Sequence, residues 1–144
     1  MKKFEEFLGT NDVRRTSRDP ALAQALRTRA EQQMKYIIQL PLTDESATLV
    51  FEQVYDALRE CTDALLALQG FKSYSHVASI TFLERYPSVM QADLATFDNA
   101  REKRNLAKYY GTPLTPAETK DLLAFYAAMK PKLDALFRQF AKPS

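Results

Sequence analysis

The stretch ATLVFEQVYDALRECTDALLALQG, residues 47–70, decides the fold of this chain. Apolar residues recur along it at spacings of four, three, four and three, which places them on one side of an α-helix. They are Val54, Leu58, Cys61, Leu65 and Leu68. Gly70 follows the last of them, and glycine is the residue that most often ends a helix. The stretch therefore predicts a long amphipathic helix that packs against other elements.

The rest of the chain has the same helical spacing, together with residues that begin and end helices. It predicts one helix from Asp19 to about residue 41, a shorter one from Ser73 to before Pro87, and two more beginning at Ser88 and at Thr115. Four substantial amphipathic helices joined by short turns can bury their apolar faces only against one another. We therefore predict an all-α fold, an antiparallel up-and-down four-helix bundle with an additional short helix.

The domain organisation predicted from the sequence is simple. A chain of 144 residues has the usual size of one domain, and 46% hydrophobic residues with only 3 glycines favour helices over a sheet. We assign residues 19–141 to the bundle. Residues 1–18 are charged and contain the sequence Gly-Thr-Asn-Asp at 9–12, which predicts a short helical start followed by a flexible lead.

Composition also restricts the function. Lysine and arginine number 20 against 18 acidic residues, so the net charge of +2 gives no overall argument for nucleic-acid binding, which would need local clustering. The first residues lack the apolar core of a signal peptide, and no apolar run approaches the roughly 18 residues of a membrane span, so we expect a cytoplasmic protein with no membrane partner.

We expect neither a cofactor nor a metal site. Cys61 is the only cysteine, lies on the apolar stripe of its helix and has no histidine or cysteine near it in sequence, which makes it a core residue. Glycine-rich phosphate loops and the nucleophile elbow are absent from the sequence. The acidic residues Asp56, Glu60 and Asp63 follow helical spacing opposite the apolar stripe, and we expect them to form a solvated face.

The sequence RNLAKYYG, residues 104–111, contains the most unusual feature of the chain. Arg104 continues an inward stripe of its helix, which reads backwards through Arg101, Phe97, Leu94 and Met90. A guanidinium keeps its charge, and burying it without a partner is costly, so Arg104 should face a partner, a cleft or a subunit interface. The alternative is that it snorkels from the helix end and pairs with an acid.

Two blocks of this sequence resemble the signature of HEPN domains, which are small helical bundles. Their shared motif is an arginine, four to six residues, and a histidine; here Arg104 is followed by Asn105, and Tyr109 stands where the shortest form of the motif has its histidine. The second block, ALLALQGFKSYSH at residues 64–76, looks like the end of helix two and the following turn of many prokaryotic members. The resemblance covers about residues 20–140.

The resemblance implies a homodimer in which the motif residues of two protomers meet in a shared cleft that cleaves RNA. In that chemistry the histidine transfers protons and the arginine steadies the phosphate, so the candidate catalytic residues here are Arg104 and Tyr109. A tyrosine, with an ordinary pKa of about 10, is a poor general base at neutral pH. We therefore expect ribonuclease activity by the usual route to be weak or absent.

Two other activities remain open for the same residues. In some toxin–antitoxin pairs with a HEPN member, a tyrosine close after the motif is adenylylated by a minimal nucleotidyltransferase, and Tyr109 and Tyr110 lie in that neighbourhood. Alternatively, the motif residues form a pocket that binds RNA or a nucleotide without turnover, with a guanidinium for phosphate and a phenol for stacking. Further candidates for that pocket are Asn105, Lys108, Tyr110, His76 and Lys72.

The sequence thus predicts a HEPN component of a prokaryotic toxin–antitoxin or defence pair, which binds RNA or a nucleotide through a degenerate ribonuclease motif. A minimal nucleotidyltransferase is a possible partner. The alternatives are an active metal-independent endoribonuclease and a non-enzymatic protein-interaction bundle. His76, the only histidine, could replace the missing motif histidine if its helix approached that of Arg104, or it could be a surface or capping residue.

Overall fold

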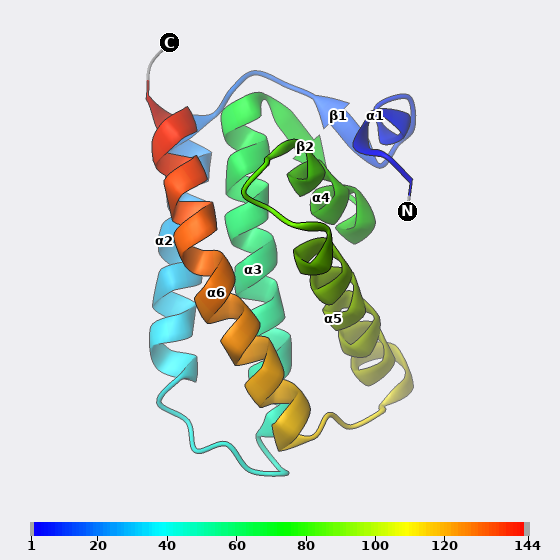
Figure 1. Cartoon of the computed structure of the whole chain (residues 1–144), viewed down its shortest axis with the longest axis vertical. Helices are drawn as coiled ribbons and strands as arrows, with labels where there is room; N and C mark the ends of the chain where they lie inside the picture. Colours follow the sequence, from blue (N-terminus) through cyan, green and yellow to red (C-terminus); the bar gives the residue numbers. More distant parts are fainter. Residues whose placement is uncertain (1, 143–144) are drawn as a thin grey trace.

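The computed structural model describes residues 2–142, which form a helical bundle with one small sheet (Figure 1). Its four long helices lie side by side and alternate in direction along the chain. They are α2 (Pro20–Ile37), α3 (Ala47–Gln69), α5 (Gln91–Tyr110) and α6 (Pro116–Ala141). The short helix α4 (His76–Phe82), followed by a 3-10 turn at Leu83–Arg85, connects the second long helix to the third. The predicted four-helix bundle with an additional short helix is confirmed.

Helix α3 is the central element, because α2, α4, α5 and α6 all pack against it. Every residue of its predicted apolar stripe is buried, and Cys61, at 6% exposed, is a core residue as expected. Burial raises the pKa of the Cys61 thiol to about 12, so the group stays protonated at neutral pH. Residues outside the stripe, including Phe51 and Tyr55, are buried as well. This helix is therefore covered on more sides than a single stripe predicts.

The expectation of a solvated acidic face on α3 is wrong. Asp56, Glu60 and Asp63 keep side-chain exposures of 35%, 17% and 28%. Each of them contacts a different neighbouring helix: Asp56 reaches α5, Glu60 reaches α2, and Asp63 accepts a hydrogen bond from Ser79 of α4. The acids are partly buried because three helices pack across the side of α3 opposite its stripe.

Most helix ends follow the predicted signals. Asp19 caps α2 by accepting a hydrogen bond from the Leu22 amide, Thr115 caps α6 in the same way, and both Gly70 and Gly111 end their helices with positive φ. Two starts differ. Ser75 caps α4, because Ser73 belongs to a strand, and α5 begins after Met90 rather than at Ser88, since the chain first makes a turn through Tyr86–Val89.

The N-terminal segment differs from the predicted flexible lead. Its short helical start is confirmed as α1 (Phe4–Phe7), but β1 (Val13–Arg15) then pairs antiparallel with β2 (Phe71–Ser73). Phe4, Phe7 and Val13 are buried. Backbone hydrogen bonds and three buried apolar side chains hold this segment on the bundle, an arrangement too irregular in spacing for periodicity to reveal.

Candidate functional site

The structure distributes the residues predicted for the site over three places. Arg104 and His76 both contact Tyr55, at the place where α3, α4 and α5 adjoin. Lys72 belongs to β2 and lines a separate cavity. The others lie at the C-terminal end of α5. They are Asn105, Lys108, Tyr109 and Tyr110.

We call Tyr55, Asp56, His76 and Arg104 the Tyr55 cluster. Arg104 is 8% exposed, and its Nη2 lies 3.5 Å from Oδ1 of Asp56. Its guanidinium carbon lies 5.6 Å from the centroid of the Tyr55 ring, within the range of a cation–π contact. Within residues 2–142 the buried Nε of Arg104 has no hydrogen-bond partner. Arg104 thus adopts the alternative arrangement, in which the arginine pairs with an acid.

The buried face of α5 explains why Arg104 reaches α3. Leu94, Phe97, Ala100 and Arg104 are the buried residues of this helix, and their spacing of three and four places all of them on one side. The predicted stripe was correct at Leu94, Phe97 and Arg104. It was wrong at Met90, which is 58% exposed, because the helix begins only after this residue. Arg104 therefore follows Phe97 into the contact with α3.

Arg101 also differs from the predicted stripe. Its Nε donates to Oδ1 of Asp98 at 2.7 Å, one turn earlier in the same helix. This hydrogen bond raises the pKa of the Arg101 guanidinium further. Arg101 therefore contributes positive charge beside the Tyr55 cluster while pairing within its own helix.

His76 is the half-buried first residue of α4. Its Nδ1 lies 2.8 Å from the Tyr55 hydroxyl, and the two rings are nearly parallel, with centroids 5.7 Å apart. Burial, and then the charges of Arg59 and Arg104, lower the pKa of His76 to about 4. Burial raises the pKa of the Tyr55 phenol, so both rings are uncharged at neutral pH. A histidine with a pKa of about 4 is a weak base, so this geometry does not supply the missing general base.

Asp56 is the counter-ion of the cluster. Burial raises the pKa of this carboxyl, and the neighbouring Arg104 and Lys108 oppose that change. Arg59, one turn further along α3, has its Nε 3.5 Å from Oδ2 of Asp63. Positive and negative groups therefore alternate along this side of α3, from Asp56 through Arg59 to Asp63.

The end of α5, which we define as Lys108, Tyr109 and Tyr110, has the opposite character. The two tyrosines are 65% and 80% exposed, and Lys108 Nζ lies 5.6 Å from the centroid of the Tyr109 ring. In the part of the chain that the structure describes, Lys108 has no carboxylate within 4.0 Å. Asn105 is half-buried one turn earlier. An unpaired ammonium beside exposed aromatic faces can contact a phosphate and a stacked base.

Sequence reasoning missed Tyr55 and Arg59 and misjudged Asp56. Tyr55 directly follows a residue of the apolar stripe, and no prediction was made for it. The sequence did contain one indication, the width of the apolar face. Residues 50, 51, 54, 55, 57 and 58 of α3 are all apolar, and together they cover more of the helix circumference than a single stripe does. Such width indicates a helix covered from several sides, with its polar residues facing neighbours.

Comparison of the chain with protein-family models, with curated proteins and with solved structures gives no match. The resemblance to HEPN domains therefore depends on the two sequence blocks quoted above. Within residues 2–142 no group of three or more histidine, cysteine and acidic side chains is placed to hold a metal ion. Over the same range, none of the helices combines the length and apolar character needed to cross a bilayer.

Proposed function

We propose that this protein is a HEPN-like helical bundle that binds RNA or a nucleotide without cleaving it by the usual HEPN chemistry. In this proposal it is one component of a prokaryotic toxin–antitoxin or defence pair. The helical bundle agrees with the fold that the resemblance implies. The end of α5 is the binding surface, and the Tyr55 cluster is the buried support on which that surface rests.

The observation that carries the proposal is the exposure of Tyr109 and Tyr110 next to the unpaired Lys108. Two adjacent aromatic side chains that are 65% and 80% exposed bury little of their area in the chain itself. Stacking on such rings tolerates any base, and a nearby ammonium adds attraction to phosphate. This combination suits a single-stranded RNA or a free nucleotide.

The state of the motif residues argues for binding rather than catalysis. Arg104, which the HEPN mechanism would use on the phosphate, is 8% exposed and paired with Asp56. Tyr109 is an exposed phenol, and the neutral His76 is bonded to Tyr55. Cleavage needs a positive group that reaches the phosphate and a base that accepts the proton of the attacking hydroxyl. Arg104 is turned to Asp56, and His76, with a pKa of about 4, is a weak base.

The proposed partners follow from the same resemblance. We propose a homodimer in which α5 lies near the two-fold axis, and a minimal nucleotidyltransferase encoded with this protein. The exposed hydroxyls of Tyr109 and Tyr110 are accessible to such an enzyme. Light scattering tests the dimer, and incubation with a purified nucleotidyltransferase and ATP, followed by peptide mass spectrometry, tests modification of either tyrosine.

A binding experiment tests the function. A fluorescent single-stranded RNA of twelve nucleotides and a fluorescent ATP analogue are titrated with the wild type, with Lys108→Ala/Tyr109→Ala and with Lys35→Ala/Tyr36→Ala. The control pair has the same Lys-Tyr sequence near the C-terminal end of α2, and its tyrosine is 72% exposed. We expect the α5 pair to weaken binding at least about tenfold, since one stacked base and one phosphate contact are lost, and the control to change it little.

Cleavage assays decide the catalytic alternative. RNA is incubated with the wild type, Arg104→Ala and Tyr109→His, first without metal and then with magnesium. We expect no cleavage by the wild type. Metal-free cleavage that disappears in Arg104→Ala would instead establish an active endoribonuclease, and equal loss of binding in the α5 and control pairs would overturn the assigned surface.

One observation favours the protein-interaction alternative. Helices α2 and α5 terminate at the same end of the bundle (Figure 1). Large apolar residues near these two helix ends are exposed, among them Tyr36, Ile38 and Leu106. Exposed apolar residues of this size suit a protein partner. Absence of RNA and nucleotide binding in the titration above would favour this function.

A further inference from the structure

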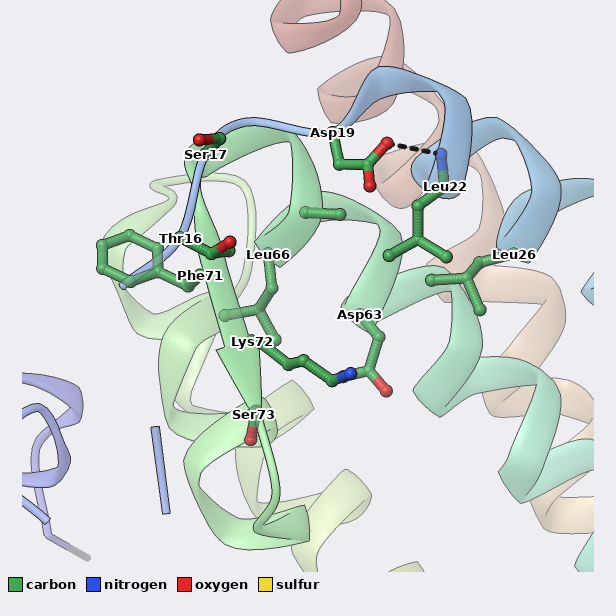
Figure 2. A pocket seen from close by; sticks show the side chains of 11 residues that line it. Thr16, Ser17, Asp19, Leu22, Leu26, Asp63, Leu66, Phe71, Lys72 and Ser73 are labelled. Carbon is green, nitrogen blue, oxygen red and sulfur yellow. Dashed lines mark hydrogen bonds between the residues drawn. The ribbon is translucent and has the colours of Figure 1, made fainter. Parts of the chain in front are cut away.

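A cavity of about 390 Å³ lies between residues 16–19, α2, the C-terminal half of α3 and β2 (Figure 2). It is distinct from the Tyr55 cluster and from the end of α5, and none of its lining residues belongs to either. Its volume falls within the range of small-molecule sites, roughly 300–1,000 Å³. We call it the Lys72 cavity.

One wall of the Lys72 cavity is apolar. Leu22 and Leu26 of α2 face it together with Leu66 of α3, and Phe71 lies at its β2 side (Figure 2). Leu22 remains 44% exposed although it is one of the first residues of a long helix on the bundle. An apolar group bound in the cavity would remove this leucine from water, which favours binding in proportion to the covered area.

The carboxylates of the cavity already have partners in the protein. Asp19 accepts the hydrogen bond from the Leu22 amide that caps α2, as the dashed line in Figure 2 shows. Asp63 accepts a hydrogen bond from Ser79 at 3.0 Å and lies 3.5 Å from Arg59. Each carboxylate therefore accepts a hydrogen bond from the protein, and Asp63 also has a cation beside it, so a positively charged ligand would have to compete with these contacts.

The positive group of the cavity lacks such a partner. Lys72 extends across the cavity toward Asp63 in Figure 2, yet in residues 2–142 no carboxylate lies within 4.0 Å of its Nζ. Its nearest aromatic contact is the Tyr74 ring, at 5.6 Å from Nζ. Thr16 and Ser17 also line the cavity. Besides its two carboxylates, the cavity offers a ligand the ammonium of Lys72, which only donates, and hydroxyl residues, which can donate or accept.

We propose that the Lys72 cavity binds a small organic acid, with its carboxylate at the Lys72 ammonium and its apolar body against Leu22 and Leu26. A carboxylate gives Lys72 the charge partner that it lacks, and the apolar body covers the exposed leucine. This assignment is independent of RNA binding at the end of α5. In this proposal Lys72 belongs to a separate ligand site and not to the RNA contacts that the sequence predicted.

Three probes of one shape test the charge. The ¹⁵N-labelled protein is titrated with phenylacetate, with phenethylamine, which carries the opposite charge, and with neutral phenylacetamide. We expect only phenylacetate to shift the amide resonances of Leu22, Leu26, Lys72 and Ser73, with a Kd on the order of millimolar for so small a ligand. The resonances of Tyr109 and Tyr110 should not move.

Substitutions locate the charge. Lys72→Ala should weaken phenylacetate binding about tenfold or more, since a charge-assisted contact is lost, whereas Lys72→Arg should retain it. Lys120→Ala is the matched control, because this lysine is exposed on α6 and does not line the cavity. Stronger binding of phenethylamine, absence of any shift with phenylacetate, or equal affinity in Lys72→Ala would overturn the proposal.

Discussion

The Tyr55 cluster and the Lys72 cavity lie along the same side of α3, but they differ in whether their cationic group has a carboxylate partner. In the cluster, Arg104 is paired with Asp56 and lies over Tyr55, and His76 is bonded to the same tyrosine. In the cavity, the acids are paired with the protein, while Lys72 has no carboxylate within 4.0 Å in residues 2–142. The charged groups of the Tyr55 cluster thus contact one another, whereas the ammonium of the Lys72 cavity is left for a ligand.

This difference shows that a charged residue at an unusual sequence position can have a partner in the protein, while one at an ordinary position can lack it. Arg104 drew attention because it stands on an apolar stripe, and the structure supplies its counter-ion from the neighbouring helix. Lys72 was predicted as a contact for RNA or a nucleotide, and in the structure it is an exposed residue that lines a separate cavity. A charged residue therefore indicates a binding site when the protein leaves it without a partner.

The largest effect is expected at Gly70, which joins the end of α3 to the wall of the Lys72 cavity. Gly70 has φ of 82°, and a Cβ at this position would lie 2.8 Å from the Thr16 carbonyl oxygen. Gly70→Ala should lower the free energy of unfolding by about 2–3 kcal/mol, because it combines a left-handed conformation with a backbone clash. Urea denaturation measures the change.

Gly111 provides the control for this substitution. It also has positive φ, 67°, but nothing lies within 4 Å of a Cβ built there. Gly111→Ala should therefore cost only about 1 kcal/mol. Equal costs at the two glycines would show that the close approach of residue 16 to the end of α3 does not hold the cavity wall in place.

The second effect tests whether Arg104 stabilises the fold. Arg104→Ala should lower the free energy of unfolding by about 2 kcal/mol while helix content stays intact, because Asp56 loses its counter-ion in a partly buried place. Arg101→Ala removes a pair within one helix and should cost about 0.5 kcal/mol. A loss at Arg104 no larger than that at Arg101 would contradict the assigned supporting role of the cluster.

The third effect isolates the contact between Tyr55 and His76. Tyr55→Phe removes the hydroxyl that lies 2.8 Å from Nδ1, and it should cost about 1 kcal/mol in thermal or urea unfolding. Tyr86→Phe is the matched control, because the buried hydroxyl of Tyr86 has no hydrogen-bond partner among the described residues. The free energy of unfolding of Tyr86→Phe should be equal to that of the wild type or slightly higher. A similar loss in both variants would mean that the contact between Tyr55 and His76 does not stabilise the fold.

The smallest net effect is the pH dependence of the wild type, because the contributions of the two regions oppose each other. The pKa of His76 falls from 6.5 to about 4 on folding, chiefly by burial, so its contribution to stability is present above pH 6.5 and is lost as pH falls through 4. The pKa of Asp63 rises from 3.8 to about 6, also by burial. The stabilising contribution of Asp63 is therefore present below pH 3.8 and is lost as pH rises through 6.

Urea unfolding at pH 7, 5.5 and 4.5 separates the two groups. His76→Gln should make stability less sensitive to acid than in the wild type, and Asp63→Asn should make it more sensitive, because each variant removes one of the opposing contributions. The same pH dependence in the wild type and both variants would mean that neither side chain is buried as the structure places it.

The sequence predicted the elements well where the signal was local. The stripe of α3, the cap at Asp19 and the helix ends at Gly70 and Gly111 all follow from spacing or from the conformations that single residues allow. The prediction differed from the structure at β1, whose pairing partner lies almost sixty residues away and leaves no periodic trace. A strand of three residues cannot show the alternation from which strands are predicted.

Only part of the candidate site could be predicted from the sequence. Arg104 and His76 were both identified from the sequence, but the residue that joins them, Tyr55, was not. Asp56 was assigned to a solvated face, because periodicity describes one helix at a time. Which side chains of two helices meet depends on how each helix is rotated and shifted against the other.

By itself, the sequence determined that this chain forms four long amphipathic helices with defined ends, because hydrogen bonding and apolar burial within a helix depend on near neighbours. Only the tertiary structure decided that Arg104 is paired with Asp56, that His76 is held neutral on Tyr55, and that Lys72 faces a cavity. Those outcomes depend on desolvation and on partners from other helices, and a charged side chain acquires its role only when its surroundings are in place.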